Sequence, residues 1–379
     1  MPIKVTHVVR QYAPSVGGME DVVQNIARQQ VDQHGQIPTI VTLDRLFTKQ
    51  DEFLPRKETI DGIRVIRLPY AGSSRYPLAP SVLRQLADAD VVHVHGIDFF
   101  YDYLAWTKWI HKRPLVASTH GGFFHTEFAS TLKKMYFNTV TRGSSLAYDR
   151  VVGTSNNDGD LFKEVVAESK LSVIENGVNV EKYAGKAAAQ LTPTAIYFGR
   201  WSSNKGLIET IELFRQMVTF DPTWQLIIAG REYDLSYDDL MGLVTKYDLG
   251  TNVRIVPNPS EKELGVLIEQ ASYYICLSRH EGFGIAPIEG MSAGLIPVLS
   301  DIPPFRQLVT QSGIGLLLDV ADLPNAVAGI NDLHRQLIRD HPGRREASQQ
   351  FVLRYSWSRI AGRYVDIYKE LVMPRKNNA

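Results

Sequence analysis

The sequence predicts an α/β protein of two domains, each built on a doubly wound parallel sheet. Apolar runs of strand length alternate with stretches of helical periodicity along most of the 379 residues. This alternation is typical of parallel sheets that helices cover on both faces. It stops at residues 184–194, AGKAAAQLTPT, and then starts again. We therefore expect two Rossmann-like domains that face each other across a cleft, with ligands at the carboxyl ends of the strands.

The first predicted domain spans residues 1–185, and its first helix is expected at Met19–Val31, where apolar residues recur at helical spacing. Its strands are predicted at Lys4–Val9, Thr39–Leu43, Ile63–Leu68, Val91–His95, Leu115–Ser118, Arg150–Gly153 and Ser172–Ile174. The second domain, residues 194–355, is predicted to have strands at Ala195–Phe198, Gln225–Ala229, Val253–Val256, Tyr273–Leu277, Ile296–Leu299 and Gly315–Leu318. Residues 356–379 are expected to form an amphipathic helix, Ser356–Val372, and a tail that returns to the first domain.

Composition and charge narrow the class of protein. The chain is 44% hydrophobic and 22% charged, as globular proteins are, and its formal net charge of zero gives no support for a nucleic-acid partner. A single cysteine, Cys276, can form no disulfide within the chain, which fits a reducing compartment. We find no signal-peptide pattern and no apolar run of the roughly 18 residues that span a bilayer. The composition therefore favours a cytoplasmic protein that is soluble or peripheral to a membrane.

The segment at residues 278–301, SRHEGFGIAPIEGMSAGLIPVLSD, carries the most informative pattern. It is predicted to be a turn and a helix between two strands, with Glu281 and Glu289 on either side of the turn. Gly282 and Gly284 would let the backbone approach a ligand, and the amides at the start of the helix favour an anion. Such a segment suits a phosphate between two sets of hydroxyl groups, as in a nucleotide sugar. The alternative is an ordinary solvated turn of a βα unit.

Two cations follow the first predicted strand of the second domain. They are Arg200 and Lys205 in the stretch FGRWSSNKG, which has glycines beside each cation. An arginine fork and a lysine point charge together suit a diphosphate. Because a diphosphate leaving group gains negative charge as its bond breaks, fixed cations would stabilise the transition state more than the ground state. The alternative is a surface loop whose cations form salt bridges.

The first domain offers a glycine turn and a histidine at predicted strand ends. Gly17 and Gly18 could present backbone amides to a phosphate or a sugar, although the turn is neither a G-x-G-x-x-G fingerprint nor a P-loop. His120, in a His-Gly-Gly sequence, could contact a sugar hydroxyl or the leaving phosphate, and a structural role is its alternative. We interpret His93 and His95 as pointing to opposite faces of one strand. With no Cys/His set at zinc spacing and no D-x-D pair, we expect no metal cofactor.

Residues 103–142 form a basic stretch, with six Lys or Arg and one carboxylate, Glu127. Within it, apolar residues follow helical spacing at Phe124, Phe128, Leu132, Met135 and Tyr136. One interpretation is a helix packed on the sheet with a solvated basic edge. The other is a membrane-surface face that receives a lipid-diphosphate acceptor, to which the candidate contributors are His125, Lys133, Lys134 and Arg142.

Taken together, these motifs resemble the retaining glycosyltransferases of family 4, which have the GT-B fold. The resemblance covers nearly the whole chain, and it is the ordered set of motifs that is specific. Longer strings, among them HVVRQYAPSVGGME, STHGGFFHT and SRHEGFGIAPIEGMSAGLIPVLSDIPPF, are similar to a narrower group of bacterial α-mannosyltransferases. The enzymes of that group use GDP-mannose and cellobiosyl-diphosphopolyprenol, and they add the third sugar of the lipid-linked repeat in xanthan and acetan assembly. The resemblance implies the same donor and acceptor here, an α-1,3 linkage, and a place at the anionic inner face of the cell membrane.

The resemblance also implies roles for residues of the second domain. Glu281 is expected to bind hydroxyls of the transferred mannose, and Glu289 to bind the ribose. The backbone of Gly282, Phe283 and Gly284 is expected to bind sugar and phosphate, and Arg200 and Lys205 to hold the diphosphate. The resemblance does not identify the guanine contacts; the candidates are two loops, residues 231–233 with Arg231, and residues 257–259.

In the first domain, the resemblance implies that Gly17 and Gly18 assist in diphosphate binding and that His120 contacts the donor sugar near the reacting carbon. In this family, retention is described as attack from the same face, with the leaving phosphate taking the acceptor proton and no metal required. The alternatives are a family 4 transferase with another nucleotide-sugar donor, a nucleotide-sugar epimerase on the same fold, and a non-catalytic scaffold of polysaccharide assembly. A dinucleotide-linked oxidoreductase is disfavoured because its phosphate fingerprint is missing.

Overall fold

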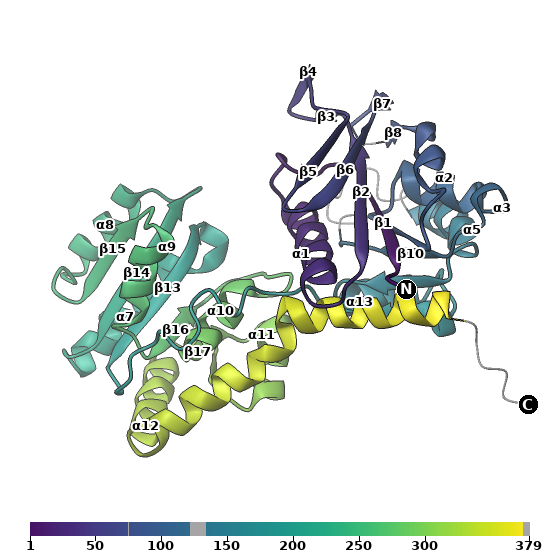
Figure 1. Ribbon diagram of the computed structural model, residues 1–379. Coiled ribbons are helices and arrows are strands. Elements are labelled where there is room, and N and C mark those ends of the chain that lie inside the picture. Colours follow the sequence, from purple (N-terminus) through teal and green to yellow (C-terminus); the bar gives the residue numbers. More distant parts are fainter. Residues whose placement is uncertain (75, 122–133, 374–379) are drawn as a thin grey trace, which may run out of the picture. The chain divides into compact units, whose positions relative to one another are not determined.

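The computed structural model describes residues 1–74, 76–121 and 134–373. The chain forms two compact units, which are described separately below (Figure 1). The first unit comprises Met1–Gly177 together with the C-terminal segment that begins at Trp357, and the second unit comprises Val178–Ser356. Within the described residues, no helix has both the length and the apolar character needed to cross a bilayer.

The first unit is built on an eight-stranded sheet with the strand order β12-β11-β10-β9-β1-β2-β6-β5. All neighbouring strands are parallel except β5 and β6, which form an antiparallel pair at one edge. Its strands are β1 (Lys4–Val9), β2 (Ile37–Leu43), β5 (Lys57–Ile60), β6 (Ile63–Leu68), β9 (Val91–His95), β10 (Leu115–Ser118), β11 (Arg150–Gly153) and β12 (Leu171–Val173). The chain adds strands on one side of β1 and later on the other side, beginning with β9. The topological switch point, where ligands of such sheets bind, therefore lies between β1 and β9.

Helices of the first unit are α1 (Gly18–Asp32), α2 (Phe99–Trp106), α3 (Lys108–His111), α5 (Arg142–Ser145), α6 (Asn156–Phe162) and α13 (Trp357–Val372). Two small hairpins pair β3 (Arg45–Leu46) with β4 (Lys49–Phe53) and β7 (Ala71–Ser73) with β8 (Tyr76–Leu78). The helix α13 packs beside α1 (Figure 1), because its apolar face, which includes Ile360, Tyr364 and Tyr368, is buried in the same cluster as Val22 and Ile26 of α1. The end of the chain is thus part of the core of the first unit.

The second unit is built on a six-stranded parallel sheet with the strand order β15-β14-β13-β16-β17-β18. Its strands are β13 (Thr194–Trp201), β14 (Gln225–Glu232), β15 (Val253–Pro257), β16 (Tyr273–Cys276), β17 (Ile296–Ser300) and β18 (Leu316–Leu318). Its helices are α7 (Leu207–Phe220), α8 (Tyr237–Lys246), α9 (Glu261–Ile268), α10 (Ile285–Ala293), α11 (Pro303–Ser312) and α12 (Leu323–Val352). The switch point of this sheet lies between β13 and β16.

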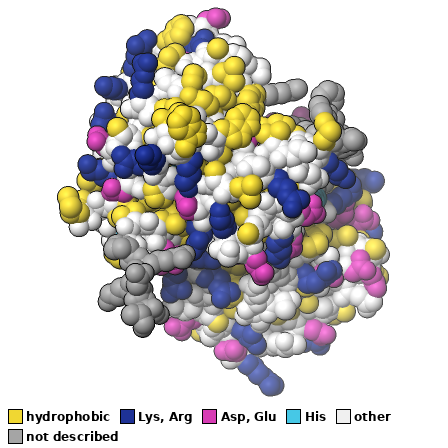
Figure 2. Space-filling view, turned by 90° about the vertical axis from the view of Figure 1, so that its right-hand side faces the viewer, with side chains coloured by type: hydrophobic (Ala, Val, Ile, Leu, Met, Phe, Trp, Pro, Cys, Tyr) yellow, Lys and Arg dark blue, Asp and Glu magenta, His cyan; other side chains and the backbone are white. Residues whose placement is uncertain are grey.

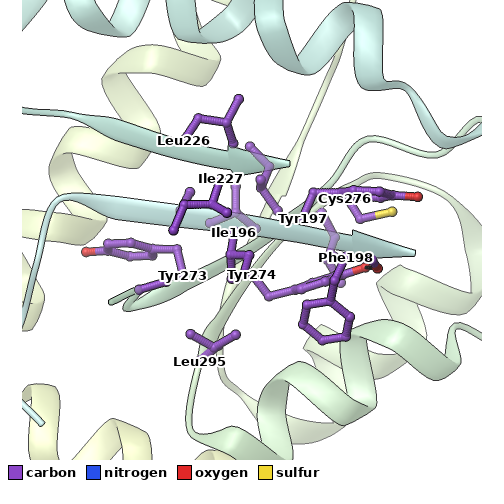
Figure 3. Close-up of a cluster of buried hydrophobic side chains, with 14 of the residues drawn as sticks. Ile196, Tyr197, Phe198, Leu226, Ile227, Tyr273, Tyr274, Cys276 and Leu295 are labelled. Carbon is purple, nitrogen blue, oxygen red and sulfur yellow. Dashed lines mark hydrogen bonds between the residues drawn. The ribbon is translucent and has the colours of Figure 1, made fainter. Parts of the chain in front are cut away.

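The core of the second unit is centred on β13, β14 and β16. Figure 3 shows Ile196, Tyr197 and Phe198 of β13 beside Tyr273 and Tyr274 of β16, and all five side chains are buried. A strand that is buried on both faces has a continuous run of apolar residues rather than an alternating pattern. In β13 this run is Ala195–Phe198.

The predicted doubly wound sheets are confirmed, and the expected strands β1, β6, β9, β10 and β11 have the predicted bounds. The stretch at 184–194 has no strand or helix before Thr194, but it does not mark the division between the units, which lies at Gly177 and again at Ser356. Instead it packs on the second unit, because the amides of Ala187 and Ala188 donate to Ala293 O at 2.8 Å and to Ala271 O at 3.0 Å.

Close contact between β13 and β14 depends on glycine. Gly230 has a φ of +152°, and a Cβ at this position would overlap the carbonyl oxygen of Gly199 on the paired strand. We expect Gly230→Ala to lower the free energy of unfolding of the second unit by about 2 kcal/mol or more, measured by denaturant titration. Gly242→Ala is the matched control: no atom lies within 4 Å of a Cβ there, and the site is inside α8. It should raise stability by about 0.5–1 kcal/mol. Equal midpoints for Gly230→Ala and the unsubstituted chain would contradict the argument.

Candidate active site

A pocket of about 310 Å³ opens at the switch point of the second sheet. Residues at the carboxyl end of β13 and in the turn after it, among them Arg200 and Lys205, form one wall of the pocket, and residues after β16, among them Glu281 and Glu289, form another. The structure therefore brings together four residues that the sequence predicted as a set. Cys276 also lines the pocket, but burial raises the pKa of its thiol, so that it stays neutral and is poorly suited to act as a nucleophile.

The two loops that carry these side chains are joined through their backbones. The amide of Arg279 donates to Asn204 O at 2.9 Å, and the side-chain amide of Asn204 donates to His280 O at 2.8 Å. Gly206, with a φ of +68°, ends the short turn that carries Lys205. A Cβ at this glycine would overlap the carbonyl oxygen of Leu277, so only glycine lets the loops approach this closely.

Lys205 and Glu281 form the centre of the pocket. The Lys205 ammonium donates to Glu281 Oε1 at 2.5 Å, and Ser278 Oγ donates to the same oxygen at 2.8 Å. Both side chains are largely shielded from solvent, with exposed fractions of 22% for Lys205 and 14% for Glu281. The second oxygen of Glu281, Oε2, has no hydrogen-bond partner within the described part of the chain. It is free to accept a hydrogen bond from a ligand.

Glu289 lies on α10, one turn into the helix, and lines the same pocket. Burial raises the pKa of this carboxyl group, the nearby Lys182 opposes that rise, and Glu261 adds to it. Lys182 itself forms a salt bridge of 2.9 Å with Glu261. Among the described residues Glu289 has no hydrogen-bond partner, so a carboxylate that is costly to bury has its oxygens available for hydroxyl groups of a ligand.

The turn before α10 contains Gly282, Phe283 and Gly284. Gly284 is the N-cap of α10 with a φ of +88°, a conformation that glycine adopts without strain. The first amides of the helix, at Ile285 and Ala286, have no carbonyl partner in the preceding turn and line the pocket. Phe283 packs edge-on against Tyr355, with ring centroids 5.6 Å apart, which holds the turn in place.

Arg200 and Arg231 lie side by side at the carboxyl ends of β13 and β14, where they are paired in register. Both are exposed, and neither guanidinium has a carboxylate within salt-bridge distance in the residues that the structure describes. The Arg200 guanidinium lies over the ring of Tyr233, 5.2 Å from its centroid. The second unit therefore presents two unpaired cations beside the Lys205–Glu281 pair.

The predicted glycine turn of the first unit precedes α1. Gly17 is the N-cap of that helix, and Gly18 is its first residue. The carboxylate of Glu20 lies over this helix start, where Ser15 Oγ donates to it at 3.0 Å. The turn therefore offers free amides, but it also carries an acidic group that an anionic ligand would have to displace. Gly17, Gly18 and His120 belong to the first unit, and the predicted donor-binding residues from Arg200 onward belong to the second.

His120 follows β10 and has a φ of +53°, which is uncommon for a residue other than glycine. Its Nε2 lies 2.9 Å from Nδ1 of the buried His95, whose Nε2 in turn lies 3.0 Å from Nδ1 of His7. The prediction that His93 and His95 point to opposite faces is wrong: their ring centroids are 4.0 Å apart, because residues two apart in a strand share a face.

His7, His93 and His95 have ring nitrogens within 4.8 Å of one another, a grouping that could hold a metal ion. Every one of these nitrogens already has a hydrogen-bond partner. His93 pairs with Tyr368 and Ser118, while His7 and His95 pair with each other and with Gln30 and His120. The grouping is therefore satisfied as a hydrogen-bond network of neutral rings. Burial lowers the pKa of His7 and of His120 to about 4 each.

The predicted acceptor and membrane residues are described only in part. His125 and Lys133 lie outside the described residues. Lys134 and Arg142 are exposed, and five exposed apolar side chains belong to the same region of the chain: Trp106, Trp109, Ile110, Met135 and Leu146.

Sequence reasoning missed several residues that shape these sites. Asn204 joins the Lys205 loop to the loop after β16, and Ser278 donates to Glu281. Gln30 and His7 lie behind His95. Gln30 is a polar residue on the buried side of α1 with an exposed fraction of 0%, and a glutamine within an apolar helical stripe is a signal that could have been noticed. The partner of Gln30, His7, is not recognisable from sequence until the register of β1 against β9 is known.

Comparison with known proteins identifies the family. The model "Glycosyltransferase Family 4" matches residues 16–182, and "Glycosyl transferases group 1" matches residues 180–349. The GDP-mannose:cellobiosyl-diphosphopolyprenol alpha-mannosyltransferase of Xanthomonas campestris is 54% identical over the full length of both chains. The enzyme of that name from Komagataeibacter xylinus is 39% identical over 100% of this chain and 96% of its own. The chain belongs to this mannosyltransferase family.

Solved structures agree with that assignment at the level of the fold. A glycosyltransferase from Rickettsia africae matches with a TM-score of 0.70 over 100% of both chains at 19% identity. HepE from Anabaena, solved in complex with UDP, matches with a TM-score of 0.68 over 97% of this chain and 100% of its own at 17% identity. The chain is thus a glycosyltransferase with the GT-B fold, and its two units are the Rossmann-like domains of that fold.

Lys205 and Glu281 offer a direct test of the pocket in this mannosyltransferase family member. We expect Lys205→Met or Glu281→Gln to slow sugar transfer by about ten- to a hundredfold or more, because each removes a charged hydrogen bond worth roughly 1.5–3 kcal/mol. Lys262→Met, at an exposed lysine of α9, is the matched control and should leave the rate unchanged. Steady-state kinetics would decide, and near-normal turnover in both pocket variants would refute the importance of the pair.

Proposed function

We propose that the chain is a retaining mannosyltransferase that moves mannose from GDP-mannose to the cellobiosyl unit of a polyprenyl-diphosphate-linked acceptor. The product would carry an α-1,3 linkage, and the reaction would belong to the assembly of an exopolysaccharide of the acetan or xanthan kind. The observation that carries the proposal is the 54% identity to a relative with that donor and acceptor in its name, over the full length of both chains. At this identity and coverage, donor and acceptor sites are both within the matched region.

The geometry of the pocket supports a nucleotide-sugar donor. In our proposal, Arg200 and Lys205 hold the diphosphate, and the free amides at the start of α10 bind the same group. Glu289 accepts hydrogen bonds from the ribose hydroxyls, since its carboxylate has no other partner among the described residues. Glu281 uses Oε1 for Lys205 and Ser278 and keeps Oε2 for a hydroxyl of the mannose. Arg231 lies at the carboxyl end of β14, in register with Arg200, and in our proposal its side chain contacts the guanine base.

The same residues account for how the sugar leaves GDP. When the bond between mannose and phosphate breaks, negative charge grows on the diphosphate, and the cations of Lys205 and Arg200 are already fixed beside it. The ion pair with Glu281 fixes the Lys205 ammonium before the donor binds, so little reorganisation is needed during the reaction. The leaving phosphate oxygen then accepts the proton of the attacking hydroxyl on the same face of the sugar, which retains the configuration. No metal ion is required in this scheme, because two cations of the chain serve the diphosphate.

Other activities on the same fold predict different behaviour in one assay. A family 4 transferase with another donor would use UDP-glucose in place of GDP-mannose. A nucleotide-sugar epimerase would convert its donor without any acceptor. A non-catalytic scaffold would make no product, and the Lys205–Glu281 pair, with two unpaired arginines beside it, is an arrangement that such a protein does not need.

The assay combines the purified chain with cellobiosyl-diphospho-lipid, GDP-mannose and EDTA, with UDP-glucose as control donor. We expect a trisaccharide-lipid from GDP-mannose alone, at a rate that EDTA does not change. A product from UDP-glucose alone, or donor turnover without acceptor, would refute the proposed donor or reaction. A product that forms from GDP-mannose only when a divalent metal is restored would refute the metal-independent scheme and leave the donor standing.

We also propose that the first unit binds the anionic inner surface of the cell membrane, where a lipid-linked acceptor resides. The support is a face that carries α2, α3 and α5, shown in Figure 2, on which hydrophobic side chains lie among Lys and Arg. Trp109 is 75% exposed and the exposed Lys112 follows it closely in the chain, while Leu146 is 75% exposed and follows the exposed Arg142. Exposed tryptophans next to cations suit the interface of a bilayer with anionic lipids.

A charge-reversal variant tests this surface. We expect Lys112→Glu, Lys134→Glu and Arg142→Glu together to lower binding to anionic liposomes by about tenfold or more, because each cation near such a surface contributes roughly 1 kcal/mol. Lys246→Glu, Arg254→Glu and Lys262→Glu together make the same change of charge on exposed positions of the second unit. Co-sedimentation with liposomes measures both. Equal binding by the two triple variants would refute a specific role for this face.

A further inference from the structure

A chain of hydrogen-bonded side chains runs through the interior of the first unit and ends at His120. It starts at Gln30 on α1, whose Oε1 lies 2.8 Å from Nε2 of His7 on β1. Nδ1 of His7 lies 3.0 Å from Nε2 of His95 on β9, and Nδ1 of His95 lies 2.9 Å from Nε2 of His120. We name these four residues the histidine relay. Gln30, His7 and His95 have exposed fractions of 0%, 0% and 1%, so bulk solvent does not reach the first three members of the relay.

The order of donors and acceptors along the relay depends on the orientation of the Gln30 amide. In the structure its Oε1 faces His7, and its buried Nε2 has no hydrogen-bond partner among the described residues. In this orientation the carbonyl oxygen can only accept, so Nε2 of a neutral His7 carries the hydrogen and Nδ1 is left as an acceptor. Nε2 of His95 must then donate to His7, and Nδ1 of His95 accepts from Nε2 of His120. Nδ1 of His120 ends the relay as an unprotonated acceptor, and it has no hydrogen-bond partner among the described residues.

The backbone and the neighbouring rings hold this arrangement in place. His120 and Gly121 have φ angles of +53° and +68°, a turn that histidine adopts only at a cost and that keeps its ring against His95. The ring of His93 lies 4.0 Å from that of His95 and is itself held by Tyr368 of α13 and by Ser118. The desolvation that lowers the pKa values of these buried histidines keeps the rings neutral at pH 7, which a defined donor order requires.

We propose that Gln30, His7 and His95 are positioning residues that fix the tautomer and orientation of His120, so that its Nδ1 is presented as a hydrogen-bond acceptor to a hydroxyl of the bound sugar. The acceptor role rests on the proposed function, whereas the tautomer is a property of the free chain. A neutral imidazole that accepts from a hydroxyl can orient the sugar without adding charge beside the reacting carbon. The assignment also explains why a glutamine is buried on α1 facing the sheet.

The first test needs no substrate. The full-length chain labelled with ¹⁵N in its histidine rings is studied by long-range ring NMR correlations at pH 7, with the signals of His7, His95 and His120 assigned by single substitutions. We expect all three to carry hydrogen on Nε2 and a lone pair on Nδ1. Hydrogen on Nδ1 of all three, which is the reverse order, would overturn the proposal, and so would a mixture of tautomers at His120.

The second test removes the start of the relay. Gln30→Met has similar volume and no acceptor, and we expect it to mix the tautomers of His120 and to slow mannose transfer by about tenfold or more. Gln30→Glu keeps an oxygen opposite Nε2 of His7 and should retain the tautomer and recover much of the rate. Gln24→Met is the matched control, since Gln24 is on the same helix but donates to Asp61 at 2.9 Å, away from the relay.

The outcomes separate the relay from the proposed function. An unchanged His120 tautomer in Gln30→Met, or equal losses of rate in Gln30→Met and Gln30→Glu, would overturn the positioning role. If the unsubstituted chain transfers no mannose, the proposed function fails, and the NMR spectra still decide whether the relay has the expected order. If Gln30→Met does not fold, the spectrum of the unsubstituted chain alone makes that decision.

Discussion

The site in the second unit depends on the close approach of two loops, and that approach depends on Gly206. At this residue the chain turns from the Lys205 loop into α7 while it passes directly against the carbonyl of Leu277, where no side chain fits. The hydrogen bonds of Asn204 with Arg279 and His280 exist only because the two backbones are this close. As a result, Lys205 and Glu281, 76 residues apart in sequence, form one ion pair with fixed geometry. The position of β13 beside β16 at the switch point makes this meeting possible.

The two units differ in whether the side chains around their candidate site residues are charged or neutral. The second unit exposes guanidinium groups and places an ammonium and two carboxylates in a pocket, at the cost of partly burying charge. Next to His120, the interior of the first unit instead contains three neutral histidines, His7, His93 and His95, whose ring nitrogens all have hydrogen-bond partners. In the function proposed above, the second unit would bind the anionic diphosphate and His120 of the first unit would bind a sugar hydroxyl, which agrees with this difference. Charge must be fixed where charge develops, whereas hydroxyl groups need only correctly oriented neutral partners.

The sequence predicted the sheets well because their central strands are apolar runs with sharp polar ends, as at Val91–His95 and Leu115–Ser118. It missed β4, in which all five residues are exposed and polar or charged apart from Phe53, because such a strand has no apolar pattern. It placed the division between the units too late, because alanines at 187 and 188 look like a linker but in fact pack against the second unit. The candidate pocket was predictable because Arg200, Lys205, Glu281 and Glu289 lie at or after the carboxyl ends of two strands that end at the same edge of one sheet. The histidine relay was not, since it requires the register of β1 with β9 and the rotation of α1 about its axis.

That register explains why the relay could form at all. Between β1 and β9, His7 is paired with His93 and Val9 is paired with His95. Between β9 and β10, His95 is paired with Ser118. A shift of one residue in either pair would turn a histidine to the other face of the sheet. The polar side chains therefore constrain the sheet, because an unpaired imidazole with no exposure to water would cost several times what its hydrogen bond contributes. The C-terminal helix adds to this constraint, since Tyr364 and Tyr368 reach Ser118 and His93 from α13. The hydrogen bonds that hold α13 on the first unit thus also hold His93, which packs against His95. His95 is the ring to which His120 is hydrogen-bonded.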